Sequence, residues 1–336
     1  MARKWYFNSE ELKNSPSFKD GVSAEKELDY KQQAAYLIKD LGKRLNLSEV
    51  SVNTATVCMH RFYTEHSLLK FHRYEVAATA IFVAAKVEEE PQKLPDVIRA
   101  LHMCLKRVDN YTLDTTTAEY RKNANSIIMN ENIFLITFEF DMDMSHPHAY
   151  ILNFCKKIHA SKELGQIFLQ LATYTLQLTS MCVKYKPAVV ACFCIYLIIK
   201  SSKWKIPEVI DGNPWFWLLD CQVTNDLFVE MDKEFSEILN KIPSRIKNWV
   251  MCLLNSSPTG QLTSTNCQVR SSISSDQETA KVLQDNLIES RNTQMTPATS
   301  VDLNMTIETI DNFSQKRKID TDTDGNFSPA KKCKLS

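Results

Sequence analysis

The sequence has 336 residues, of which 44% are hydrophobic and 24% charged, and its formal net charge is zero. This length and composition predict one or two domains with hydrophobic cores. Its 6 glycines are too few for an all-β protein with many tight turns, and no GxxxxGK or GxGxxG phosphate-binding loop occurs.

The sequence contains no segment typical of a membrane span or a secretion signal. Its longest apolar run, AVVACFCIYLIIK at residues 188–200, is shorter than the roughly 20 residues that a bilayer requires. The N-terminal stretch, MARKWYFNSEEL, turns polar and acidic at once. We therefore expect an intracellular protein with no membrane partner.

The 10 cysteines have no regular spacing and do not form paired CxxC motifs. Cys192 and Cys194 lie within the apolar run at 188–200. Reduced thiols buried in the core are the better interpretation, so we expect neither a metal site nor a cofactor.

Helical periodicity dominates from residue 27 to residue 242. After an N-terminal extension (1–26) with a short helix, the sequence predicts five helices and one charged, Thr-rich loop at 106–117. The expected helices cover residues 27–47, 49–68, 71–86, 92–103 and 121–138. Gly42 is a weak point within the first of them.

A second helical series begins at HPH, residues 146–148, where proline suits the first turn of a helix. The expected helices cover residues 148–159, 162–180, 187–200, 215–221 and 225–241. A shift of 114 positions places VAATAIFVAAK, which ends at Lys86, on VACFCIYLIIK, which ends at Lys200. This match predicts a duplicated five-helix unit with the third helix at the centre of each bundle.

The composition changes after residue 250. Residues 251–336 are rich in Ser, Thr, Asn, Gln and Asp and contain no tryptophan. We therefore predict domains at 27–142 and 143–250, followed by a disordered polar tail at 251–336.

Several motifs in this order resemble the cyclin family. They are MHRFY at 59–63, AATAIFVAAKVEEEPQKL at 77–94 and ENIFLITFEF at 131–140. Further motifs resemble the transcriptional cyclins and cyclin T in particular: KWYFNSEELKNSPS, ELDYKQQAA, VNTA, SHPHAY and DGNPWFWLLD. Cyclin K is next, because KVEEEP and HRFY fit it as well, whereas QQAA at 32–35 and NTA favour cyclin T.

The resemblance implies an all-α fold of two tandem five-helix cyclin boxes, with an N-terminal helix and a disordered C-terminal tail. It also implies a non-catalytic regulatory subunit that binds a cyclin-dependent kinase and holds the kinase's regulatory helix in its active position. The complex, of the positive transcription elongation factor b type, would phosphorylate the C-terminal domain of RNA polymerase II and promote elongation.

In cyclins, a lysine that ends the third helix and a glutamate on the fifth form a pair that reaches the kinase backbone. The matching residues are Lys86 and Glu131. By position alone, Lys86 could instead extend to water at a helix C-terminus, where the macrodipole favours a cation. Phe82 and Phe140 match kinase-facing aromatics of cyclin T, although an aromatic on a helix is more often part of the core.

The sequence departs from cell-cycle cyclins at a patch that in those proteins carries an apolar docking site with a tryptophan. The corresponding residues are Tyr30, Gln33, Ala34 and Leu37, so recruitment of substrates there is doubtful. Family members usually have arginine where this chain has Lys31, which cannot make a bidentate contact.

The aromatics Trp204, Trp215, Phe216 and Trp217 resemble a region where elongation scaffold proteins dock. Tryptophans at the end of a small bundle serve a structural role about equally often. The three tryptophans are therefore candidate scaffold-docking residues.

Three further features of the sequence suggest sites. His146 and His148 have an HxH spacing that could bind metal, but without a third ligand nearby a helix start is the better interpretation.

Two basic clusters predict a bipartite nuclear localisation signal and a nuclear protein, the alternative being a solvated charge run. Their residues are Lys316, Arg317, Lys318, Lys331, Lys332 and Lys334. Ser328 precedes a proline and is a candidate phosphorylation site beside the second cluster.

Two other functional classes remain. A cyclin-fold general transcription factor would bind DNA directly, but residues 1–250 are close to neutral and phosphate binding needs a basic face. We therefore expect no direct contact with nucleic acid. A hydrolytic or metal enzyme would need converging catalytic side chains, and the sequence suggests none.

Overall fold

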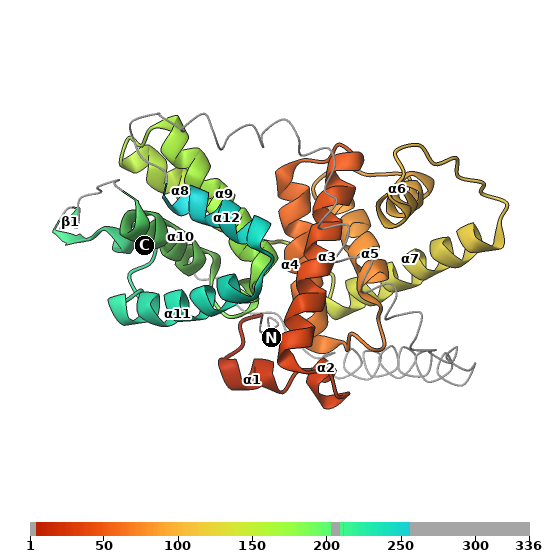
Figure 1. The fold of residues 1–336 in the computed structure, drawn as a ribbon, viewed down its shortest axis with the longest axis horizontal. Helices are drawn as coiled ribbons and strands as arrows, with labels where there is room; N and C mark the ends of the chain where they lie inside the picture. The colour runs from red at the N-terminus through yellow and green to blue at the C-terminus, as the bar shows by residue number, and fades with distance from the viewer. Residues whose placement is uncertain (1–4, 203–208, 211, 256–336) are drawn as a thin grey trace, which may run out of the picture. The chain divides into compact units, whose positions relative to one another are not determined.

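The computed structural model describes residues 5–202, 209–210 and 212–255, and their regular secondary structure is almost all helical (Figure 1). Within these residues no helix has the length and apolarity needed to cross a bilayer. The predictions for Trp204, for the two basic clusters and for Ser328 fall outside the described residues.

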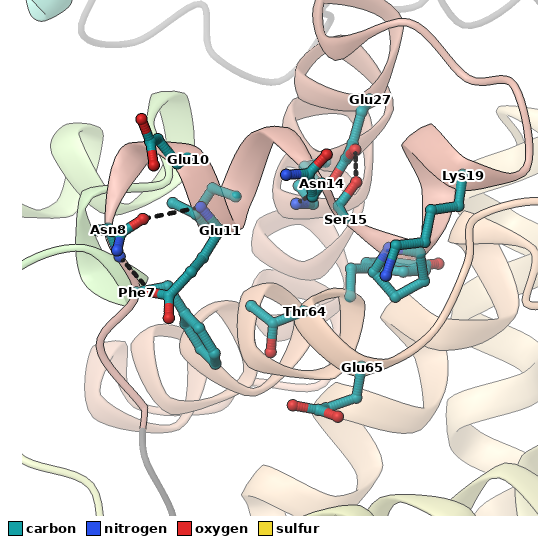
Figure 2. A pocket seen from close by; sticks show the side chains of 14 residues that line it. Phe7, Asn8, Glu10, Glu11, Asn14, Ser15, Lys19, Glu27, Thr64 and Glu65 are labelled. Atoms are coloured by element: carbon teal, nitrogen blue, oxygen red, sulfur yellow. Dashed lines mark hydrogen bonds and ion pairs between the residues drawn. The ribbon is translucent and has the colours of Figure 1, made fainter.

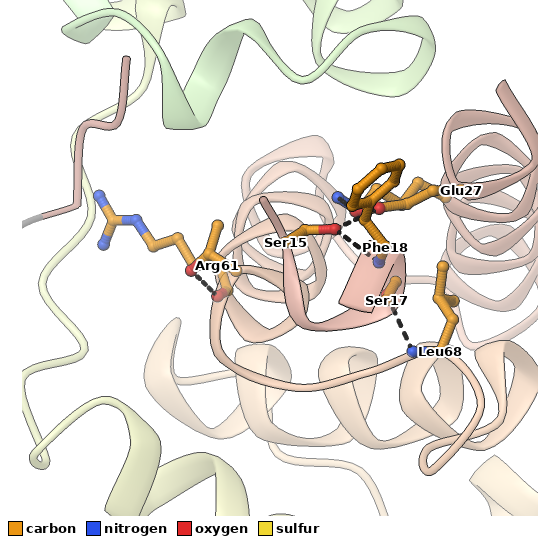
Figure 3. A network of polar contacts seen from close by, with 8 residues as sticks. Ser15, Ser17, Phe18, Glu27, Arg61 and Leu68 are labelled. Atoms are coloured by element: carbon orange, nitrogen blue, oxygen red, sulfur yellow. Dashed lines mark hydrogen bonds and ion pairs between the residues drawn. The ribbon is translucent and has the colours of Figure 1, made fainter. Parts of the chain in front are cut away.

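The N-terminal extension forms two short helices, α1 (Ser9–Lys13) and α2 (Pro16–Lys19), where the sequence predicted one. Ser15 caps α2, because its hydroxyl oxygen accepts a hydrogen bond from the Phe18 amide at 3.1 Å. The same hydroxyl donates to Glu27 at 2.6 Å, and Ser17 accepts from the amide of Leu68 at 3.1 Å (Figure 3). This polar network attaches the extension to the helices that follow.

The first bundle consists of α3 (Ala24–Arg44), α4 (Glu49–Glu65), α5 (Arg73–Val87), α6 (Leu94–Lys106) and α7 (Ala118–Thr137). As predicted, α5 is its central helix and contacts the other four. The small side chains of Ala77, Ala78 and Ala80 are fully buried, which allows these neighbours to approach closely.

The second bundle consists of α8 (Pro147–Lys157), α9 (Lys162–Leu178), α10 (Pro187–Ser201), α11 (Asn225–Lys241) and α12 (Ser244–Leu254). Between these helices lie the 3-10 turns η1 (Met181–Val183) and η2 (Trp215–Leu218) and an antiparallel pair of short strands, β1 (Val209–Ile210) and β2 (Asn213–Pro214). The all-α fold with two tandem five-helix units is therefore confirmed.

The prediction for the fourth and fifth helices of this bundle was wrong in detail. The expected helix at 215–221 is only the 3-10 turn Trp215–Leu218, in which Trp215 and Phe216 are both buried. The fifth helix is α12, which continues beyond residue 250 because Val250, Leu253 and Leu254 lie on one face and pack inward.

Buried polar side chains join the two bundles. His60 on α4 donates from Nε2 to the carbonyl oxygen of Leu176 at 3.0 Å, and Gln32 on α3 donates to that of Leu178 at 2.8 Å. His148 on α8 lies 2.9 Å from the Thr173 hydroxyl and 3.5 Å from the Asn53 amide nitrogen of α4. The junction is thus a specific hydrogen-bonded contact as well as an apolar one.

We expect Gly42→Ala to destabilise the protein, although glycine to alanine within a helix normally stabilises by about 0.5–1 kcal/mol. A Cβ at Gly42 would overlap Cγ2 of Val52 on α4. Overpacking of this kind costs about 1–3 kcal/mol. The matched control is Gly165→Ala on α9, where the nearest atom lies 3.8 Å away. Urea unfolding that ranks Gly42→Ala as stable as Gly165→Ala would contradict the close packing of α3 and α4.

We also expect the junction histidines to make stability depend on pH. Burial is the main cause of the lowered pKa values of these rings. The pKa of His60 falls from 6.5 to about 3, and those of His146 and His148 fall from 6.5 to about 4. The folded protein keeps these rings neutral while the unfolded chain protonates them, so their contribution is complete above pH 6.5 and declines as pH falls toward 4.

Urea unfolding between pH 7 and pH 5 measures this slope, which is about 1.4 kcal/mol per pH unit below the unfolded pKa for each histidine. A His148→Asn variant should show a smaller slope than the wild type. Equal slopes would mean that this ring is not held neutral in the fold.

Candidate functional site

Lys86 is the exposed end of a helix that is otherwise buried. Its Nζ lies 2.6 Å from Oε1 of Glu131 on α7 and 4.0 Å from the centroid of the Phe82 ring. The side chains of Lys86 and Glu131 are 43% and 18% exposed. A partly exposed pair of this kind stabilises a fold by only about 0–1 kcal/mol, so stability alone does not account for it.

Phe82 was expected to face a partner directly, but it is only 6% exposed. Its ring lies beneath the Lys86 ammonium, one turn earlier on α5. A cation over an aromatic face is attracted by about 0.5–1 kcal/mol at an exposed site. Phe82 therefore orients Lys86 and contributes little open surface.

Phe140 lies beyond the C-terminal end of α7 and is 63% exposed. The helix ends in a Schellman motif, in which the amide of Phe140 donates to the Leu135 carbonyl at 2.9 Å and that of Glu139 to Ile136 at 3.0 Å. Both Glu139 and Phe140 have positive φ, at 53° and 62°. The backbone thus fixes an exposed aromatic side chain just beyond the end of α7.

Two exposed apolar residues on α7, Ile128 (45%) and Met129 (47%), were not among the site residues predicted from the sequence. Ile128 is one turn before Glu131 and shares its face of the helix. The run Ile127, Ile128 and Met129 gave an indication, because three consecutive residues do not share one face of a helix that packs on one side only; of the three, only Ile127 is buried. Lys86, Glu131 and Ile128 together are called the Lys86 surface below.

The glutamates that follow Lys86 connect α5 to α4. Glu90 accepts hydrogen bonds from the Ser48 amide at 3.0 Å and the Ser51 hydroxyl at 2.7 Å, at the N-terminus of α4. These bonds lower the pKa of the Glu90 carboxyl, and an anion is favoured at this end of a helix. Glu89, which lies between Glu88 and Glu90, has a φ of 59°. It is the C′ residue of a second Schellman motif, at the end of α5.

The second bundle repeats part of this arrangement. Lys200 ends α10, lies 2.7 Å from a carboxylate oxygen of Asp232 and lies 5.8 Å from the ring centroid of Tyr196. The carboxylate belongs to α11, the fourth helix of its bundle, whereas Glu131 belongs to the fifth helix of the first. The two lysine sites are therefore similar but not equivalent.

Of the candidate scaffold-docking tryptophans, Trp215 is buried and packs against Phe154 and Phe228. Its contacts are those of a structural residue. Trp217 is exposed, so the docking prediction depends on it among the described tryptophans.

Most of the residues predicted to correspond to the docking patch of cell-cycle cyclins are buried. The guanidinium of Arg73 lies between the rings of Tyr30 and Tyr74, 4.4 and 4.5 Å from their centroids. Its Nε donates to Gln33 at 2.9 Å, and Ala34 and Leu37 are buried. No open apolar patch is formed by these residues.

His146 and His148 do not approach a third metal ligand within the described residues. His146 is the N-cap of α8, which begins at Pro147, one residue before the predicted start. Each ring is hydrogen-bonded to a threonine, His146 to Thr54 and His148 to Thr173.

A concave pocket of about 550 Å³ lies between α1, α2, α3 and the end of α4 (Figure 2). Its lining includes the buried ion pair of Lys31 and Glu27, whose atoms are 2.6 Å apart. Lys31 thus makes one contact to Glu27 where an arginine could make two parallel ones. None of the residues of the Lys86 surface lines this pocket.

Two sequence models of cyclin domains match the chain. The cyclin N-terminal domain matches residues 3–143, and the domain described as Cyclin-T2-like, C-terminal matches residues 146–238. Their boundary falls between α7 and α8, where the first bundle ends and the second begins.

Curated proteins similar to this chain include several cyclin T proteins. Cyclin-T of Drosophila melanogaster is 45% identical over 244 residues, which are 73% of this chain and 22% of the relative. Cyclin-T1 of Mus musculus is 44% identical over 250 residues, 74% of this chain and 34% of the relative. Human Cyclin-T2 is 43% identical over 249 residues, with shares of 73% and 34%. The chain thus spans about a fifth to a third of the length of these relatives.

Solved structures support the fold. A chain of the yeast RNA Pol II CTD kinase CTDK-1 complex matches with a TM-score of 0.51 at 14% identity, over 74% of this chain and 89% of that chain. A chain of the CAK complex of Chaetomium thermophilum matches with a TM-score of 0.54 at 13% identity, over 98% and 95%. The predicted resemblance to cyclin T is confirmed by the sequence relatives. With a cyclin domain matched to each of its two bundles, the chain belongs to the cyclin family.

Proposed function

We propose that this chain is the regulatory subunit of a transcriptional cyclin-dependent kinase, of the positive transcription elongation factor b type. The complex would phosphorylate the C-terminal domain of RNA polymerase II in the nucleus. The observation that supports this proposal is the Lys86 surface, in which the ammonium at the end of a buried helix is oriented by Phe82 and Glu131, and an exposed apolar side chain, Ile128, lies one turn before that glutamate on α7. The cyclin T relatives agree with it.

The chemistry of Lys86 suits a contact with a partner's backbone. An ammonium has three donors, and Glu131 accepts from one of them. The other donors can reach carbonyl oxygens of a docked kinase, and such charge-assisted bonds strengthen when the interface excludes water. Ile128 supplies apolar surface on the same face, and Phe140 extends it beyond α7 if the kinase spans both.

A subunit that binds in this way activates the kinase without taking part in phosphoryl transfer. The active kinase needs its β3 lysine paired with the glutamate of helix αC, and αC has two positions that a bound partner can bias. A shift from 1% to 99% active requires about 5.5 kcal/mol of differential binding. The catalytic groups belong to the kinase, and the cyclin supplies a rigid docking surface.

We expect Lys86→Glu to abolish activation of the kinase, because it places a second carboxylate beside Glu131 and removes the donors. The measurement is phosphorylation of an RNA polymerase II tail peptide by the reconstituted complex. The matched control is Lys200→Glu, which makes the same change at the corresponding position of the second bundle. If both variants lost activity equally, or if neither lost activity, Lys86 would not have the proposed role.

We expect Phe140→Ala to weaken kinase binding about tenfold, because burying a phenylalanine side chain contributes about 1.5–3 kcal/mol. Its effect on unfolding should be small, since the ring is already 63% exposed in the free chain. Val229→Ala on α11, a site 64% exposed, is the control. Calorimetric titration that finds full affinity for Phe140→Ala would place the kinase elsewhere.

A further inference from the structure

Three hydrogen-bonded side chains join the end of α5 to the start of the second bundle. Oγ1 of Thr54 lies 2.7 Å from Oε1 of Glu88 and 2.7 Å from Nε2 of His146. Glu88 is the C-cap of α5, two residues after Lys86, and His146 is the N-cap of α8. Thr54 lies on α4 and is fully buried. A single buried hydroxyl therefore connects three helices.

The direction of these hydrogen bonds follows from the groups involved. The threonine hydroxyl has one proton, and an ionised carboxylate only accepts, so Thr54 donates to Glu88. His146 must then carry its proton on Nε2 and donate to the threonine oxygen. Burial, followed by the charge of Arg61, lowers the pKa of His146 to about 4, so the ring is neutral near pH 7. The hydrogen bond of Thr54 to Glu88 and that of His146 to Thr54 thus depend on each other.

The segment after Lys86 contacts α4 at two points. Glu90 binds Ser48 and Ser51 at the N-terminus of α4, and Glu88 binds Thr54 one turn further along. Of the two glutamates, only Glu88 bonds to a side chain, Thr54, that also bonds to a residue of the second bundle. Loss of the Thr54 hydroxyl would leave Glu88 without this partner and His146 with an unpaired buried donor.

We propose that Thr54 and His146 are positioning residues for Lys86: the second bundle, where it contacts α4, fixes the last turn of α5 through Glu88. The inference rests on the function proposed above and deepens it. Kinase affinity then depends on the junction of the two bundles as well as on the Lys86 surface.

The test compares kinase affinity of the full chain carrying Thr54→Val with that of Thr56→Val. Thr56 is the matched control, since it lies on the same helix and is equally buried, but its hydroxyl binds only the Val52 carbonyl of its own helix, at 2.9 Å. We expect Thr54→Val to weaken kinase binding about three- to tenfold and Thr56→Val to leave it unchanged. Equal affinities would overturn the proposal.

A second pair of variants tests the role of the second bundle. His146→Asn shortens the side chain so that it cannot reach Thr54, whereas His148→Asn makes the same change at a ring that bonds Thr173. We expect only His146→Asn to weaken kinase binding. An equal loss in both variants would mean a general effect of the junction and would contradict a specific path through Thr54.

A double-mutant cycle separates positioning from a merely structural role. In a Lys86→Ala background, Thr54→Val should cause no further loss of affinity, because its effect acts through Lys86. The same loss in both backgrounds would overturn the proposal. Wild-type affinity of Lys86→Ala itself would instead refute the proposed function, so the two failures are distinguishable.

Hydrogen exchange in the free chain gives a readout that needs no kinase. Thr54→Val should speed exchange of the Glu88 and Glu90 amides, which bond to Ala84 and Ala85 in the last turn of α5, and Thr56→Val should not. Unchanged exchange at these amides in Thr54→Val would contradict the claim that the hydroxyl fixes this turn, even if Lys86→Ala abolishes binding beyond detection.

Discussion

The enclosure of α5 by four other helices is the constraint on which the rest of the first bundle depends. Its alanines let the neighbouring helices approach closely, and its charged side chains lie toward its two ends: Arg73 and Glu75 in the first turn, and Lys86 in the last turn, where the helix emerges. Lys86 occupies that position, with Phe82 beneath it and Glu131 beside it. The buried helix therefore both orders the core and determines where the bundle presents a cation.

The three glutamates after Lys86 have separate structural tasks. Glu90 satisfies donors at the start of α4, Glu89 takes the left-handed turn, and Glu88 reaches the buried hydroxyl of Thr54. An exposed acidic run in the sequence thus becomes a set of specific contacts. Because Thr54 also contacts His146, the end of α5 is tied to the second bundle.

The two bundles resemble each other at the C-terminal ends of their central helices, and the resemblance is limited. Lys86 and Lys200 both end a central helix above an aromatic residue. Their carboxylate partners come from different helices, α7 in the first bundle and α11 in the second. Similar patterns on the two central helices therefore do not produce equal surfaces, because the surrounding helices pack differently.

The sequence by itself determined the helical class, the two series of helices, the central helix of each and the pairing of Lys86 with Glu131, because apolar periodicity and family motifs are local features of the chain. Only the tertiary structure decided that Phe82 and Trp215 are buried, that Ile128 is exposed and that α12 belongs to the second bundle. Burial depends on which helix faces packs together. The bond of Thr54 to both Glu88 and His146 joins residues far apart in the chain, and no sequence period encodes it.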